Sequence, residues 1–263
     1  MRLRPAVAIA ATPVLLLLGA HPAAAGDSTP TCFGHRATIV GTDHHDVLRG
    51  TSRADVIVTR GGGDTVYAGG GDDLVCAGNG NDVVYGGAGA DHILAGGGAD
   101  HVYGQAGDDV EVGGDGNDVM SGGAGDDVEI GGLGNDHLSG DDGADHMSGQ
   151  AGDDVEVGGA GDDVITGGTG NDLENGQAGD DHLSGDSGAD HLIGGADDDA
   201  LEGGGQDDVV EGGTGADHVD GGTGADECGD DGAATTCDDD QGQDEAGDIS
   251  GDSSSHTAVT AAA

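Results

Sequence analysis

A period of nine residues governs this chain from Gly41 to Gly229. The span runs without insertion or deletion, so it contains 21 copies of one phrase, G-G-x-G-x-D-x-U-x, where U is a large apolar residue. The sixth position is Asp in every copy, and the eighth is apolar in 17. A period this strict predicts stacked, equivalent units rather than one irregular globular core.

The phrase divides into a part suited to turning and a part suited to a strand. Its first six positions are rich in glycine, which allows positive φ and close backbone approach. Its last three positions, x-U-x, suit a very short strand whose middle side chain points inward. Two copies would make one coil, and successive coils would stack as parallel strands about 4.8 Å apart. The expected fold is all-β: a parallel β-roll, or β-solenoid, of about 10.5 coils.

The charge balance restricts the partners of such a roll. The chain has 53 Asp and Glu but only 6 Arg and no Lys, which gives a net charge of −47. Nucleic acid and anionic membranes are excluded as partners, because binding phosphates requires Lys and Arg. Without a cation the chain is expected to behave as a disordered polyanion.

The repeated Asp supplies a place for that cation. Copies of the same parity lie on the same edge of the roll, so Asp91, Asp109 and Asp127 would stack one above another. A bare column of carboxylates repels itself. Ca²⁺ accepts six to eight carboxylate and carbonyl oxygens in flexible geometry, whereas Mg²⁺ demands a tight octahedron and keeps its waters. The turns therefore favour Ca²⁺.

The phrase resembles the nonapeptide of the RTX, or hemolysin-type, calcium-binding repeat family, whose fold is a parallel β-roll. The resemblance implies multiple Ca²⁺ ions, on the order of ten, held between neighbouring turns. It implies that the sixth-position Asp side chains are ligands, together with carbonyl groups of turn glycines such as Gly87, Gly89, Gly123 and Gly125. The implied Asp ligands are Asp64, Asp73, Asp82, Asp91, Asp100, Asp109, Asp118, Asp127, Asp136, Asp145, Asp154, Asp163, Asp172, Asp181, Asp190 and Asp217. Sites are doubtful at the turns where His44, Arg53, Asp197 and Gln206 replace the fourth-position glycine.

The segments outside the repeats suggest export. Residues 1–25 read as a signal peptide, with Arg2 and Arg4, an apolar run over 6–18 and small residues at 23–25. The alternative is an uncleaved membrane anchor, but the run is short and Pro13 interrupts it. We expect residues 26–40 to be an N-terminal cap and residues 230–263 to be an acidic, disordered tail without a membrane anchor. The predicted protein is secreted and extracellular.

Four cysteines lie near the two ends of the repeats: Cys32, Cys76, Cys228 and Cys237. An exported chain with four cysteines suggests two disulfides, for which the sequence allows three pairings. The positions favour Cys32–Cys76 and Cys228–Cys237. A metal site is the alternative, although no C-x-x-C spacing is present.

Seven histidines occupy seventh positions and raise the question of a zinc or nickel site. No two of them are separated by two copies, which is the step between vertical neighbours, so they are expected to be solvated and not to form chelating pairs. They are His92, His101, His137, His146, His182, His191 and His218. The identical stretches 104–114 and 149–159, which lie five copies apart, indicate duplication of a block of five copies.

Four eighth positions carry Glu in place of an apolar residue: Glu111, Glu129, Glu156 and Glu174. They form two pairs whose members are two copies apart, so each pair would stack on one inner face. Buried carboxylates are unfavourable unless protonated, paired with an ion or rotated outward. A catalytic pair is conceivable, but we expect a local distortion of the core.

The sequence predicts a non-enzymatic protein that folds when it binds Ca²⁺. No effector domain accompanies the repeats, and no basic, aromatic groove for a substrate is evident. The purpose stays open between a calcium buffer or matrix component and an adhesive or surface-interaction module. Ice binding is disfavoured because the third position varies and offers no Thr ladder. A polysaccharide-modifying enzyme is disfavoured by the missing groove, and no protein or polysaccharide partner is indicated.

Overall fold

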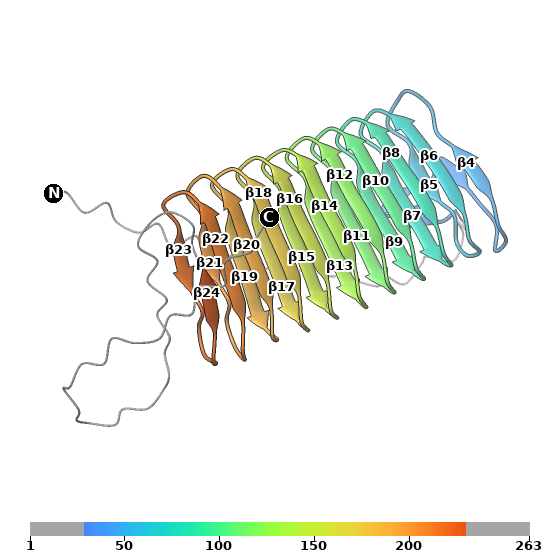
Figure 1. Cartoon of the computed structure of the whole chain (residues 1–263). Helices are drawn as coiled ribbons and strands as arrows, with labels where there is room; N and C mark the ends of the chain where they lie inside the picture. Colours follow the sequence, from blue (N-terminus) through green and yellow to red (C-terminus); the bar gives the residue numbers. More distant parts are fainter. Residues whose placement is uncertain (1–28, 230–263) are drawn as a thin grey trace, which may run out of the picture.

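The structure is a computed structural model that describes residues 29–229. Two parallel sheets of 11 strands each face one another along a rod, and a two-stranded antiparallel hairpin lies at its N-terminal part (Figure 1). The predicted signal peptide (1–25) and acidic tail (230–263) lie outside the described residues. Within residues 29–229 no helix is long and apolar enough to cross a membrane.

Odd-numbered strands from β3 form one sheet, the odd sheet, and even-numbered strands from β4 form the other, the even sheet. The hairpin is β1 (Thr31–Cys32) and β2 (His35–Arg36). The odd sheet comprises β3 (Ile39–Val40), β5 (Val56–Val58), β7 (Leu74–Asn79), β9 (His92–Gly97), β11 (Val110–Asp115), β13 (Val128–Leu133), β15 (His146–Ala151), β17 (Val164–Thr169), β19 (His182–Ser187), β21 (Ala200–Glu202) and β23 (His218–Asp220). The even sheet comprises β4 (Val47–Arg49), β6 (Thr65–Gly70), β8 (Val83–Ala88), β10 (His101–Ala106), β12 (Val119–Ala124), β14 (His137–Asp142), β16 (Val155–Ala160), β18 (Leu173–Ala178), β20 (His191–Ala196), β22 (Val209–Thr214) and β24 (Glu227–Gly229).

The register confirms two repeats per coil. Each strand pairs in parallel with the strand two places later, and paired residues occupy the same repeat position two copies apart, as in Ile93↔Glu111 of β9 and β11. The same offset recurs along both sheets, so every repeat position forms a column parallel to the rod axis. The β-roll predicted from the nine-residue period is confirmed.

The strands are longer than expected. Most contain six residues rather than three, because pairing continues through the first three positions of the next repeat, as in β9. Inward and outward alternation explains this extension: Ile93 at the eighth position and Ala95 at the following first position are both buried. The small first-position residue can face the narrow interior, so only the fourth to sixth positions remain for the turn.

The core is a single line of side chains between the two sheets. Its large apolar members are eighth-position residues, among them Val84, Ile93, Leu138, Ile165 and Leu192, all of them fully buried. Glycine or alanine at the first position fills the space beside them. Such a core has little thickness, which leaves the turns as the main place where further stabilisation can be added.

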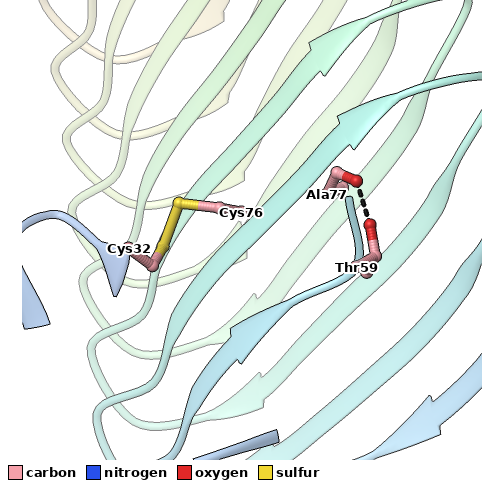
Figure 2. Close-up of a disulfide and its surroundings, with 4 residues drawn as sticks. All are labelled: Cys32, Thr59, Cys76 and Ala77. Carbon is pink, nitrogen blue, oxygen red and sulfur yellow. Dashed lines mark hydrogen bonds between the residues drawn. A yellow bond between two sulfur atoms is a disulfide. The ribbon is translucent and has the colours of Figure 1, made fainter. Parts of the chain in front are cut away.

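A disulfide joins the hairpin to the roll. Cys32 of β1 is bonded to Cys76 of β7, with the two Cα atoms 5.7 Å apart (Figure 2). This pairing confirms one of the two predicted disulfides. Cys237 lies outside the described residues, so the pairing of Cys228 with Cys237 stays a prediction.

The hairpin covers the flank of the roll rather than its end. Cys76 is an outward, ninth-position residue of the odd sheet, and the Phe33 ring meets the ring of His92 at 6.0 Å. The end of the roll instead carries Ile39 of β3, which precedes the first repeat, and Leu48 of the first degenerate repeat, and both pack partly buried against the core. The described part of the expected cap (26–40) therefore has two parts: the hairpin is a strap on the side of the roll, because Cys32 is anchored two coils into the sheet, and β3 is the terminal strand of the odd sheet.

Candidate metal centre

Glycine carbonyls and close backbone approach shape each turn. Gly87 and Gly89 have φ of +120° and +126°, and Gly123 and Gly125 have +110° and +141°. A Cβ atom on Gly89 would lie 2.6 Å from the carbonyl carbon of Gly71 in the preceding coil. Glycine at these positions lets consecutive turns stack closely, which concentrates main-chain carbonyl oxygens at the two edges of the rod.

The sixth-position Asp side chains link consecutive turns. Asp109 Oδ1 accepts a hydrogen bond of 2.7 Å from the backbone N–H of Asp91, and Asp127 Oδ1 accepts one of 2.7 Å from Asp109. The same contact recurs from coil to coil along both edges. Each carboxylate thereby receives one charge-assisted bond at the oxygen facing the preceding coil.

The second oxygen of these carboxylates has no hydrogen-bond partner. Oδ2 is buried and unpartnered in every sixth-position Asp from Asp64 to Asp226. The set includes all 16 predicted ligands, which are Asp64, Asp73, Asp82, Asp91, Asp100, Asp109, Asp118, Asp127, Asp136, Asp145, Asp154, Asp163, Asp172, Asp181, Asp190 and Asp217. A buried anionic oxygen without a partner is strongly unfavourable, so each one calls for a cation or a proton.

Burial disturbs the acidity of these groups. Burial, together with the repulsion of neighbouring carboxylates, raises the pKa of Asp91 to about 6 and that of Asp109 to about 7. The hydrogen bond from the preceding backbone N–H only partly offsets burial. The roll without a cation therefore holds carboxyl groups that resist ionisation near neutral pH.

In the first two turns, Oδ2 of the sixth-position Asp has hydrogen-bond donors and needs no cation. Asp46 Oδ2 accepts bonds from the Thr42 backbone N–H (2.6 Å) and the Thr42 hydroxyl (2.9 Å). Asp55 Oδ2 is bonded in the same way by Thr51, at 2.7 Å and 2.8 Å. These bonds hold the pKa of Asp46 below its usual value. The prediction that these turns differ agrees with this geometry, although the cause is Thr at the second position as well as the lost glycine.

The turns of Asp197 and Gln206 keep the regular geometry despite lacking glycine. Both residues adopt positive φ, at 84° and 88°. Asp199 and Asp208 are buried, and each leaves Oδ2 unpartnered as in the regular copies. Asp199, Asp208 and Asp226 were not among the ligands predicted from the sequence. The invariant Asp at the sixth position was the signal that could have included them.

The four core glutamates are a correction to the sequence prediction. Glu111 pairs in register with Glu129, and Glu156 with Glu174, and all four are fully buried. The expected local distortion is absent from this described part of the sheets, because the backbone register holds every strand in place. Burial raises the pKa of Glu156 to about 8, and burial raises the pKa of Glu111 well above its ordinary value, reinforced by the adjacent Glu129.

The histidines lie outside the core, as predicted. His92 and His101 are exposed, and their strand partners in the neighbouring coils are Leu74, Val110, Val83 and Val119 rather than histidine. No histidine column forms along the described strands. Their positions give no support to a zinc or nickel site.

An aromatic column was missed by sequence reasoning. Tyr67, Tyr85 and Tyr103 stack on the outer face of the even sheet with ring centroids 5.0 Å apart, and the Arg49 guanidinium lies 4.2 Å from the Tyr67 ring centroid. The signal was the spacing of two repeats between successive tyrosines, which places ninth-position residues in one column.

The donor set of the turns fits Ca²⁺. It consists of buried carboxylate oxygens and main-chain carbonyls, which are the hard oxygen ligands that Ca²⁺ accepts. Among residues 29–229 no three His, Cys, Asp or Glu side chains converge on one point. Each site therefore has to combine one or two carboxylates with carbonyl oxygens from the turns.

The family comparison identifies the repeats. The model of the RTX calcium-binding nonapeptide repeat matches residues 40–75, 77–111, 112–129, 130–156, 157–173, 175–210 and 193–228. The chain belongs to this family, and its cofactor is Ca²⁺.

Comparisons with individual proteins add less. No curated protein matches the chain. Among solved structures, a hyperactive, Ca²⁺-dependent, β-helical antifreeze protein from an Antarctic bacterium is similar at 22% identity, covering 74% of this chain and 82% of that chain, with a TM-score of 0.31. This degree of similarity carries no functional argument.

Proposed function

We propose that this protein is a secreted calcium-binding protein that winds into the β-roll when Ca²⁺ occupies its turns. The sixth-position Asp from Asp64 to Asp190 and Asp217 supply the side-chain ligands, and turn carbonyls such as those of Gly87, Gly89, Gly123 and Gly125 complete the sites. The proposal extends to Asp199, Asp208 and Asp226. Its activity is binding and not catalysis.

The unpartnered Oδ2 column is the observation that carries this proposal. Folding brings these oxygens out of water without giving them a donor, so the folded state gains from cations that the unfolded chain binds weakly. Binding free energy then becomes folding free energy. At the low calcium concentration inside a cell the chain would remain an extended polyanion, and it would fold after export.

Calcium titration followed by calorimetry and circular dichroism tests the proposal. We expect β-sheet signal to appear together with the uptake of several ions, and we expect EGTA to abolish it. Mg²⁺ at equal ionic strength serves as the control for charge screening. A chain that is equally folded in EGTA, or that responds equally to Mg²⁺, would contradict the proposal.

A second candidate function is an adhesive or surface-interaction module, and the tyrosine column favours it. Tyr67, Tyr85 and Tyr103 form a regular aromatic column on the outside of an otherwise acidic rod, with Tyr67 exposed and the other two half-buried. Aromatic groups that reach the surface commonly mark contact surfaces. Binding of the calcium-loaded protein to immobilised polysaccharides, compared with Tyr85→Ser, tests this function. Calcium-dependent binding that the variant loses would support it, and equal binding by both proteins would argue against it.

A further inference from the structure

The four core glutamates occupy positions where the roll otherwise places apolar side chains. Glu111 lies in register between Ile93 of β9 and Glu129 of β13, and Glu129 is followed by Met147 of β15. Neither oxygen of Glu111 nor of Glu129 has a hydrogen-bond partner. An ionised carboxylate buried in this way costs several kcal/mol, so the pair needs a compensating charge.

The glutamates reach toward the unpartnered oxygens of the turns. A Cβ atom built on Gly104 would lie 2.7 Å from Glu111 Oε1 and 2.7 Å from Gly122 O, and Asp109 Oδ2 is closer still. At the equivalent Gly86 the same direction meets a methyl group, Ile93 Cδ1, at 3.3 Å. Glu111 therefore adds an anionic oxygen beside the orphaned oxygen of Asp109.

The other sheet carries the same arrangement. A Cβ atom on Gly167 would lie 2.5 Å from Asp172 Oδ2 and 2.8 Å from Glu174 Oε1. Glu174 Oε1 also accepts a 3.0 Å hydrogen bond from the Gly167 backbone N–H, while its Oε2 is buried without a partner. No Lys or Arg follows Arg60 in the sequence, so no basic side chain from the later coils can neutralise either cluster.

We propose that Glu111 and Glu174 are inner ligands of Ca²⁺, each sharing an ion with the sixth-position Asp of its own repeat. At the first site Glu111, Asp109 and the carbonyl of Gly122 provide three hard oxygens, and at the second Glu174 and Asp172 provide two. Glu129 and Glu156 hold the adjacent place in each column, and their buried oxygens also lack a hydrogen-bond partner. The inference rests on the proposed function, because it presumes that Ca²⁺ occupies the turns.

The alternative is that each glutamate is a neutral acid that donates its proton to the Asp oxygen. Two substitutions separate these cases. Glu111→Gln keeps the shape and can still donate to Asp109 Oδ2, but it cannot neutralise a cation. Glu111→Ile restores the apolar residue present in the neighbouring coil and keeps the core filled. Glu202→Gln, at an exposed ninth position of β21, is the matched control.

Calcium stoichiometry by equilibrium dialysis and the calcium midpoint of folding by circular dichroism are the readouts. We expect Glu111→Gln to bind about one ion fewer or to raise the midpoint severalfold, and Glu174→Gln to add an equal loss. Glu111→Ile should fold with the same reduced stoichiometry, which keeps the test valid should the Gln variant fold poorly. The control should match the wild type.

The inference is overturned by Gln and Ile variants that bind as many ions as the wild type at an equal or lower midpoint, since the glutamates would then be neutral acids. A wild-type protein that neither binds Ca²⁺ nor folds with it would instead refute the proposed function. The two failures are distinguishable because the first requires a calcium-responsive wild type.

Discussion

At the scale of single residues, the two oxygens of each repeated carboxylate have different tasks. Oδ1 of Asp109 accepts the N–H of Asp91, whereas Oδ2 faces a place without a donor. The first oxygen holds consecutive coils together, and in the proposed function the second oxygen binds the cation. A substitution that replaces only Oδ2 therefore tests cation binding while it keeps the hydrogen bond between coils.

Asp109→Asn is that substitution, because the amide keeps an acceptor for Asp91 and replaces Oδ2 with a donor. With Ca²⁺ we expect the folding midpoint to rise about tenfold, which corresponds to ~1.4 kcal/mol. In EDTA the variant should be more folded than the wild type, because a buried charge has been removed. Circular dichroism measures both. The exposed Asp115→Asn is the control, and equal shifts in the two variants would show that only net charge matters.

The raised pKa values of the repeated Asp side chains predict opposite pH responses with and without calcium. Asp91 and Asp109 have folded-state pKa values of about 6 and 7, above the usual 3.8. Protonation therefore favours the folded state: in EDTA, stability is greatest at acid pH and is lost as pH rises through 6 to 7. With Ca²⁺, protons compete for the ligands, so the calcium midpoint should rise on acidification. Circular dichroism at pH 4.5 and 8 in EDTA checks the sign, and greater folding at pH 8 would contradict it.

At the scale of elements, the sequence predicted one strand per repeat and the pairing of strands two repeats apart, but it predicted neither the length of the strands nor the additional strand β3 before the first repeat. The coil of two repeats followed from counting the period, and Ile93↔Glu111 confirms it. Strand length depended on where first-position residues such as Ala95 point, which no single repeat reveals. The flanking position of the hairpin depended on Cys76 facing outward. The hydrogen bonds from Thr42 and Thr51 to Asp46 and Asp55 depend on the geometry of the turns. The absence of a fourth-position glycine does not reveal that geometry.

The first coil is expected to resist calcium removal better than the others. The carboxylates of Asp46 and Asp55 accept hydrogen bonds from Thr42 and Thr51. The Cys32–Cys76 disulfide joins the hairpin to β7, the third strand of the odd sheet. Hydrogen exchange in EDTA should therefore retain more protection in β3 to β7 than in β11 to β17. Uniform exchange along the chain would contradict this expectation.

Thr51→Val tests the cause of that protection. It removes the hydroxyl that bonds Asp55 Oδ2 but keeps the backbone donor and the side-chain shape, so it should cost about 1 kcal/mol of calcium-independent stability. Thr65→Val on β6 is the control, and it should have little effect or a slightly favourable one, since valine suits a strand. The comparison uses exchange rates of the β5 amides in EDTA.

At the scale of the whole molecule, the proposed function makes the calcium response depend on the net charge of −47 and on the pairing of each coil with its neighbours. Each coil pairs only with its two neighbours, so stability accumulates along the rod as in other solenoids. Small-angle scattering should show a radius of gyration that falls from about 55 Å without calcium toward about 20 Å with it. Sodium chloride at equal ionic strength should produce only part of this compaction. A radius that responds equally to both salts would mean that screening, not binding, folds the rod.

The alternation of repeats between the two sheets also determines on which sheet a duplicated block of repeats lies. The block containing Glu111 and Glu129 on the odd sheet recurs five repeats later as Glu156 and Glu174 on the even sheet. Five repeats are an odd number, so a duplication of five repeats places the copy on the opposite sheet of the rod. Duplication of an odd number of repeats thus places the same glutamate pair on both sheets, whereas duplication of an even number would place both pairs on a single sheet.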